Sequence, residues 1–167
     1  MKKILALMMA VLLIGAFIGC GTEPQSDDTA DTDEEITEEQ KNMVKVTYDM
    51  KMKIGDTPVS VDWEKNAAVD ALAELTSGKW YDIGLSMYGG FEQVGAIGAD
   101  LPKEDKQTSA GPGDIVLYQG NQIVVFYGNN SWAYTRLGHI TDKTEEELTE
   151  LLGNGDVTVS IMTEFSE

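Results

Sequence analysis

The sequence predicts a small, mostly β domain in residues 43–167, folded as a closed barrel of about eight strands with two short helices. Several short stretches alternate apolar with polar residues, which is the period of a half-buried strand. Turn residues separate these stretches, and only two segments carry the apolar spacing of a helix. A closed barrel also leaves no unpaired strand edge, which favours it for a small β domain.

The first part of the domain begins with alternation over residues 44–54 and again over 59–63. A Gly-Asp-Thr-Pro turn separates the two stretches, so we expect them to pair as a hairpin. A helix should follow, because Asn66 is a favoured N-cap residue and Gly78 is typical of a helix end.

The second part contains the clearest hairpin, two apolar stretches around the turn Gln119-Gly120-Asn121. Residues 102–113 are polar and are predicted to form a loop. Thr144 and Glu147 have the spacing of a capping box, which predicts a second helix ending at Gly153. Strands are expected over 80–88, 91–97, 115–118, 123–127, 133–140 and 157–161.

The N-terminus has the pattern of an export signal. Lys2 and Lys3 precede an uncharged, mostly apolar run over residues 4–18, which predicts a signal peptide in residues 1–19. The run is shorter than the roughly 20 residues that a transmembrane helix needs.

Cys20, directly after Gly19, resembles the cysteine of a bacterial lipobox, which implies that it is diacylated and becomes the first mature residue. The predicted location is then the bacterial cell membrane, lipid-anchored and facing outside the cytoplasm. Phe17 departs from the lipobox pattern, and the alternatives are an uncleaved anchor or an ordinary signal peptide with an incidental cysteine. Since Cys20 is the only cysteine, a lipidated chain has no disulfide and no thiol chemistry.

Residues 20–42 are predicted to be the lipidated cysteine and a disordered acidic linker. Between Gly21 and Gln40 there are nine Asp or Glu residues and no Lys or Arg, so the segment cannot bury enough apolar surface to fold. The domain itself carries 20 acidic and nine basic residues between 43 and 167, a net charge of −11. This charge argues against binding to nucleic acid.

Several segments of the domain look like the bacterial cyclophilin-like domain family, in order and with similar spacing. They are Tyr88-Gly89-Gly90-Phe91-Glu92, Gly111-Pro112-Gly113-Asp114-Ile115, Leu117-Tyr118, Val125-Phe126-Tyr127-Gly128 and residues 131–138. The resemblance covers nearly all of residues 43–165 and implies the eight-stranded cyclophilin barrel. The biochemical role of that family is largely unassigned.

True cyclophilins are peptidyl-prolyl isomerases that use an arginine on a central strand, and the resemblance places that position within residues 85–91. No arginine lies there, and the only arginine of the chain, Arg136, belongs to a different predicted strand. A neutral side chain cannot supply the same charge-assisted hydrogen bond. No catalytic residue is therefore assigned. Neither a cofactor nor a metal site is predicted, since the chain has one histidine, His139, and no flavin-binding motif.

Aromatic residues with a few polar neighbours predict a ligand pocket, because small-molecule and peptide sites have this composition. The resemblance implies pocket roles for Phe91, Gln122 and Trp132. Phe126 is expected in the core, and Trp132, which follows a loop, is expected to be exposed. The full set of predicted pocket residues is Phe91, Gln93, Tyr118, Gln122, Trp132, Tyr134 and Arg136.

Three classes of function are compatible with these observations. The favoured class is a membrane-anchored, non-catalytic binding module for a peptide, a protein or a small molecule. The alternative is an extracytoplasmic prolyl isomerase that assists folding, which the missing arginine disfavours. The third is an accessory subunit of an envelope complex that uses an exposed face.

Overall fold

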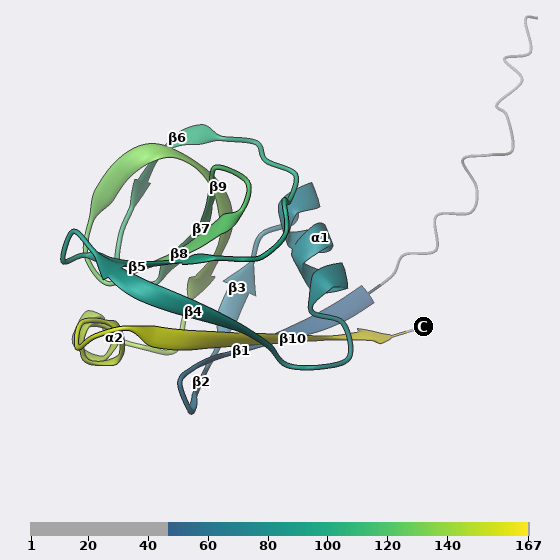
Figure 1. Ribbon diagram of the computed structural model, residues 1–167, viewed down its shortest axis with the longest axis horizontal. Helices are drawn as coiled ribbons and strands as arrows, with labels where there is room; N and C mark the ends of the chain where they lie inside the picture. Colours follow the sequence, from purple (N-terminus) through teal and green to yellow (C-terminus); the bar gives the residue numbers. More distant parts are fainter. Residues whose placement is uncertain (1–46, 167) are drawn as a thin grey trace, which may run out of the picture. The chain divides into compact units, whose positions relative to one another are not determined.

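The computed structural model describes residues 47–166, which form one domain built on a ten-stranded antiparallel sheet (Figure 1). The strands are β1 (Thr47–Ile54), β2 (Thr57–Val59), β3 (Val61–Trp63), β4 (Tyr81–Tyr88), β5 (Glu92–Ala96), β6 (Lys106–Ala110), β7 (Asp114–Tyr118), β8 (Gln122–Phe126), β9 (Asn130–Ile140) and β10 (Val157–Ser166). The helices are α1 (Ala67–Leu75) and α2 (Glu145–Leu152). The predicted signal peptide, Cys20 and the acidic linker lie outside the described residues.

The sheet is a nearly closed barrel. Its strand order is β2-β1-β10-β4-β5-β8-β7-β9-β3, and β6 pairs with β9 beside this path. The two end strands, β2 and β3, are separated only by Ser60, so the chain itself joins the ends of the sheet. The mostly β fold with two helices is confirmed, with ten strands in place of about eight.

Both helices begin where the sequence predicts. The Asn66 side chain accepts a hydrogen bond from the Val69 amide at 3.0 Å, which caps α1. Thr144 and Glu147 form the capping box of α2 through reciprocal bonds between side chain and backbone. The first helix ends at Leu75 with Thr76 as its C-cap, before the predicted end at Gly78.

The polar segment 102–113, predicted to be a loop, contains β6. This strand has the sequence KQTSA, in which only Ala110 is buried, and its strand ladder joins it to β9 alone. An edge strand without an apolar face has no period-two signal, which explains the error. The stretch 59–63 is also divided, because β2 pairs with β1 whereas β3 pairs with β9.

The central strands β7 and β8 are buried on both faces. Ile115 and Leu117 belong to a main core that also contains the apolar side chains of α1 and α2. The residues of β7 and β8 that alternate with the core positions face the opposite side. With one residue each from β6 and β9 they form a second cluster, which consists of Ala110, Val116, Val124, Phe126 and Tyr134. A half-buried sheet would leave this second face to water, so it needs a cover of its own.

Strand β9 supplies that cover. Its first half, Asn130–Tyr134, pairs only with β6, whereas its second half pairs with β7 and β3. Figure 1 shows β9 as a long, strongly curved ribbon beside β6. The first half therefore leaves β7 and brings Tyr134 into the second cluster. Within the described residues, no helix is long and apolar enough to cross a membrane.

Candidate functional site

A pocket of about 330 Å³ lies beside the second cluster, between the curved half of β9 and strands β4, β5, β7 and β8. Its volume is at the lower end of the range for small-molecule sites. The lining residues are Tyr88, Glu92, Val94, Tyr118, Gln122, Val124, Asn130, Trp132 and Tyr134.

Packing fixes one aromatic wall of the pocket. Tyr134 is buried and meets the rings of Tyr118 and Phe126 edge to face, with centroids 6.0 and 5.8 Å apart. Its hydroxyl accepts a hydrogen bond from Asn130 Nδ2 at 3.0 Å. Such edge-to-face contacts add stability beyond the burial of area. This wall is therefore preorganised.

The rim of the pocket is aromatic and exposed. Trp132 is 58% exposed and Tyr88 is 66% exposed, although both are large side chains. Exposed aromatic surface beside a concave site is typical of a recognition surface. The prediction that Phe126 is core and Trp132 exposed is confirmed.

Glu92 is the charged residue of the pocket, and sequence reasoning missed it. Its side chain is only 5% exposed, and its Oε2 atom has no hydrogen-bond partner among the described residues. Burial raises the pKa of Glu92 above its ordinary value, and a hydrogen bond from the Asn130 side chain offsets part of that rise. Glu92 lies two residues before Val94, on the face of β5 that the pocket uses, but neither residue was predicted to line a pocket, so the sequence offered no signal for it.

Four of the seven predicted pocket residues come together here: Tyr118, Gln122, Trp132 and Tyr134. Phe91 does not line the pocket. It packs against the second cluster, and Gly128 lies so close that a Cβ there would be 2.8 Å from Phe91 Cβ. The prediction that Phe91 lines the pocket is corrected, since Phe91 packs against the second cluster.

Gln93 also does not line the pocket, because successive residues of a strand face opposite sides. Its side chain is fully buried, and Nε2 donates to the carbonyl oxygens of Leu152 at 2.6 Å and Gly155 at 2.7 Å. These carbonyls lie at the end of α2 and just beyond it. Gln93 therefore holds α2 to the barrel.

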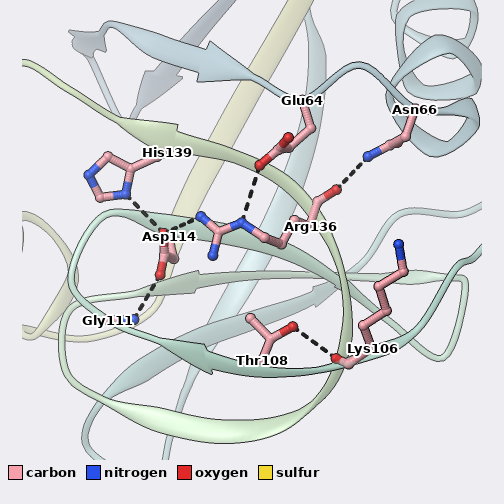
Figure 2. Close-up of polar contacts among 8 residues, drawn as sticks. All are labelled: Glu64, Asn66, Lys106, Thr108, Gly111, Asp114, Arg136 and His139. Atoms are coloured by element: carbon pink, nitrogen blue, oxygen red, sulfur yellow. Dashed lines mark hydrogen bonds and ion pairs between the residues drawn. The ribbon is translucent and has the colours of Figure 1, made fainter.

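Arg136 belongs to a separate polar cluster, shown in Figure 2. Its Nε donates to Glu64 Oε1 at 3.2 Å, and its guanidinium donates to Asp114 Oδ1 at 2.9 Å. The expectation that Arg136 lines the aromatic pocket is wrong. Alternation along β9 groups it with Trp132 and Tyr134, but the strand changes partner between them and turns Arg136 toward β7.

Asp114 is the centre of this cluster. Its carboxylate also contacts His139 Nδ1 at 2.9 Å and accepts from the Gly111 amide at 2.9 Å (Figure 2). Burial by itself would raise the pKa of Asp114, but the bonds from Gly111, His139 and Arg136 together lower it below the ordinary value. Arg136, His139 and Gly111 all contact this one buried carboxylate, which is the arrangement of a structural ion-pair network.

The pocket lining supplies hydroxyl, amide, indole and carboxyl groups, and no Lys, Arg or His. Across the described chain, no group of three or more His, Cys, Asp or Glu side chains is placed to hold a metal ion. The arrangement is suited to enclosing a small group against aromatic faces, with one carboxyl group inside.

A family model described as the cyclophilin-like family matches residues 52–162 of the chain. No curated protein and no solved structure shows significant similarity to it. The matched span includes every strand that borders the pocket. Together with the nearly closed barrel and its two helices, the match establishes that the chain belongs to the cyclophilin-like family.

Proposed function

We propose that the chain is a lipid-anchored protein outside the cytoplasm, whose cyclophilin-like domain binds a ligand in the aromatic pocket without catalysing a reaction. The observation that carries the proposal is the pocket itself: an exposed aromatic rim over a packed wall that contains one buried carboxyl group. A concave site lined by aromatic side chains is uncommon on the surface of a single domain, and such sites usually bind ligands.

The pocket favours binding over prolyl isomerisation. An isomerase of the cyclophilin type needs an arginine directed at the prolyl nitrogen, and the sole arginine of the chain is paired with Glu64 and Asp114. The acidic Glu92 cannot donate a charge-assisted hydrogen bond as a guanidinium does. Turnover of a proline peptide in a protease-coupled assay, lost on changing Gln122, would contradict the proposal.

The anchoring part of the proposal rests on Cys20 and the signal-like residues before it. In a bacterial host fed with labelled palmitate, we expect the full chain to carry label and to sediment with membranes. Cys20→Ala should lose the label, because the acyl chains of a lipidated chain are attached at Cys20. Equal labelling of the variant and the unchanged chain would contradict lipid anchoring.

The binding part of the proposal is tested at Trp132. Its side chain is exposed at the rim, so Trp132→Ala should weaken binding of a pocket ligand by about tenfold or more. The free energy of unfolding should change by less than about 0.5 kcal/mol. Calorimetry of the full chain with cationic, neutral and anionic small molecules and short proline peptides measures the first effect, and urea unfolding measures the second.

Trp80→Ala is the matched control, since Trp80 is 40% exposed and lies outside the aromatic pocket, next to Lys53. It should leave the affinity unchanged. If Trp132→Ala lowers stability and leaves every affinity unchanged, Trp132 is a structural residue and the proposal fails. If both tryptophan variants lose affinity equally, the loss does not arise in the pocket.

A further inference from the structure

Glu92 is a buried acid without a compensating charge. None of the ion pairs formed among the described residues includes it, and one of its carboxyl oxygens has no partner. Buried carboxylates are costly unless they are paired, so natural domains retain few of them without a reason. Asp114, in the same domain, is contacted by the Arg136 guanidinium, the His139 ring and a backbone donor. The contrast makes Glu92 the exception.

The groups around Glu92 are aromatic. Tyr88, Tyr118, Trp132 and Tyr134 line the same pocket from three other strands. The face of an aromatic ring carries partial negative charge and attracts cations, most strongly where water is excluded. Trp132 and Tyr88 are at the exposed rim, whereas Tyr134 and Glu92 are buried. A cation entering the pocket would pass aromatic faces and end beside a carboxylate.

We propose that the ligand of this pocket carries an alkylammonium group, which the aromatic side chains enclose and the Glu92 carboxylate neutralises. This inference rests on the proposed binding function and names its ligand class. The group could belong to a small molecule or to a lysine or methyl-lysine side chain of a peptide. The net charge of −11 on residues 43–167 acts in the same direction, because it attracts cations over a longer range.

A competing arrangement is a protonated Glu92 that donates a hydrogen bond to a neutral carbonyl ligand. Burial, which raises the pKa of Glu92, favours the protonated form in the empty pocket. The two arrangements predict opposite pH dependences of the ligand affinity. Affinity for a cation should increase as pH rises through the pKa of Glu92, whereas affinity for a carbonyl ligand should decrease.

The titratable groups that face Glu92 do not obscure this test. They are the tyrosines of the pocket, and burial and the neighbouring Glu92 raise the pKa of Tyr134 further above its ordinary value of 10.0. Glu92 is the only carboxyl group among the residues that line the pocket. A pH series that ends near neutrality therefore changes the charge of Glu92 alone among the residues lining the pocket.

The experiment is calorimetric titration of the full chain with choline and with 3,3-dimethylbutan-1-ol, which has the same shape without the charge. We expect choline to bind about tenfold more tightly or better, the size of effect that cation–π and ionic contacts produce in a desolvated site. A second arm uses a short peptide with a central trimethyllysine and the same peptide with leucine there. Preference for choline identifies a small-molecule ligand, and preference for the trimethyllysine peptide identifies a protein side chain.

Glu92→Gln should remove about tenfold or more of the affinity for whichever cation binds, because the amide has the same shape and no charge. Glu74→Gln is the matched control, since Glu74 is exposed on α1 and the variant changes the net charge equally. An affinity that survives Glu92→Gln overturns the inference. So does a cation affinity that falls as the pH rises toward neutrality.

The failure of this inference is distinguishable from failure of the binding function. If 3,3-dimethylbutan-1-ol or a proline peptide binds in a way that depends on Trp132 and the cations do not, the pocket is a binding site for a neutral ligand and only the cation inference is overturned. If no probe binds, or if binding does not depend on Trp132, both are overturned.

Discussion

Replacing Asp114 with asparagine is expected to lower the free energy of unfolding by about 2–3 kcal/mol at neutral pH. The buried carboxylate accepts from Arg136, His139 and the Gly111 amide, all at 2.9 Å. An asparagine side chain has one acceptor oxygen, so its amide nitrogen must face one of these donors. The loss should be smaller than the roughly 3–5 kcal/mol typical of removing one partner from a fully buried ion pair. Arg136 retains its ion pair with Glu64 and is partly exposed to solvent.

The loss should depend on pH in a defined direction. The folded-state pKa of Asp114 is lowered, so its contribution is complete above the ordinary carboxyl pKa and disappears as pH falls through the lowered value. Urea unfolding at neutral pH should therefore show a larger difference between Asp114→Asn and the unchanged chain than unfolding in acid. Glu64→Gln, which removes only the more exposed partner of Arg136, should cost less than about 1 kcal/mol. Equal costs for the two variants would contradict a central role for Asp114.

Replacing Gln93 with leucine is expected to lower the free energy of unfolding by about 2 kcal/mol without changing ligand affinity. The substitution removes the Nε2 amide that donates hydrogen bonds to the carbonyl oxygens of Leu152 and Gly155, so both carbonyls lose this donor. The cost is limited because Gln93 Oε1 has no partner itself, and leucine removes that buried oxygen.

The matched control for Gln93→Leu is Gln122→Leu. Gln122 lies on β8, is partly exposed and lines the pocket. Its substitution should change ligand affinity and have little effect on the unfolding transition, which is the reverse of the pattern for Gln93. Thermal unfolding and calorimetric titration of both variants measure the two effects. A change in affinity for Gln93→Leu at unchanged stability would restore Gln93 to the binding site.

The parts of the fold that the sequence predicts are those decided by local chemistry. Asn66 and the pair Thr144 and Glu147 cap their helices through bonds within one turn. The hairpin of β7 and β8 follows from two apolar runs around a tight turn. By contrast, β6 exists because β9 curves away from β7 and offers a free edge, which no pattern within residues 106–110 encodes.

In the candidate site, too, local relations could be inferred from the sequence and long-range contacts could not. Trp132 and Tyr134 line the same pocket because they share one face of one strand, a relation that alternation within the strand already indicates. Gln93 and Arg136 are assigned wrongly because their partners, the end of α2 and Asp114, are distant in sequence. Glu92 was missed because a single acidic residue in a strand is ordinarily expected to be exposed, whereas in the fold it is buried and lines a pocket with residues of β9 that are distant in sequence.

Fluorine NMR of the full chain labelled with fluorotryptophan tests most directly whether the aromatic pocket is the binding site. The chain has three tryptophans, Trp63, Trp80 and Trp132, and only Trp132 lines the pocket. Titration with choline, 3,3-dimethylbutan-1-ol and a short proline peptide should shift and saturate the Trp132 signal for at least one probe, while the signals of Trp63 and Trp80 stay in place. A saturable shift of Trp80 with Trp132 unmoved, or no shift with any probe, would contradict the account.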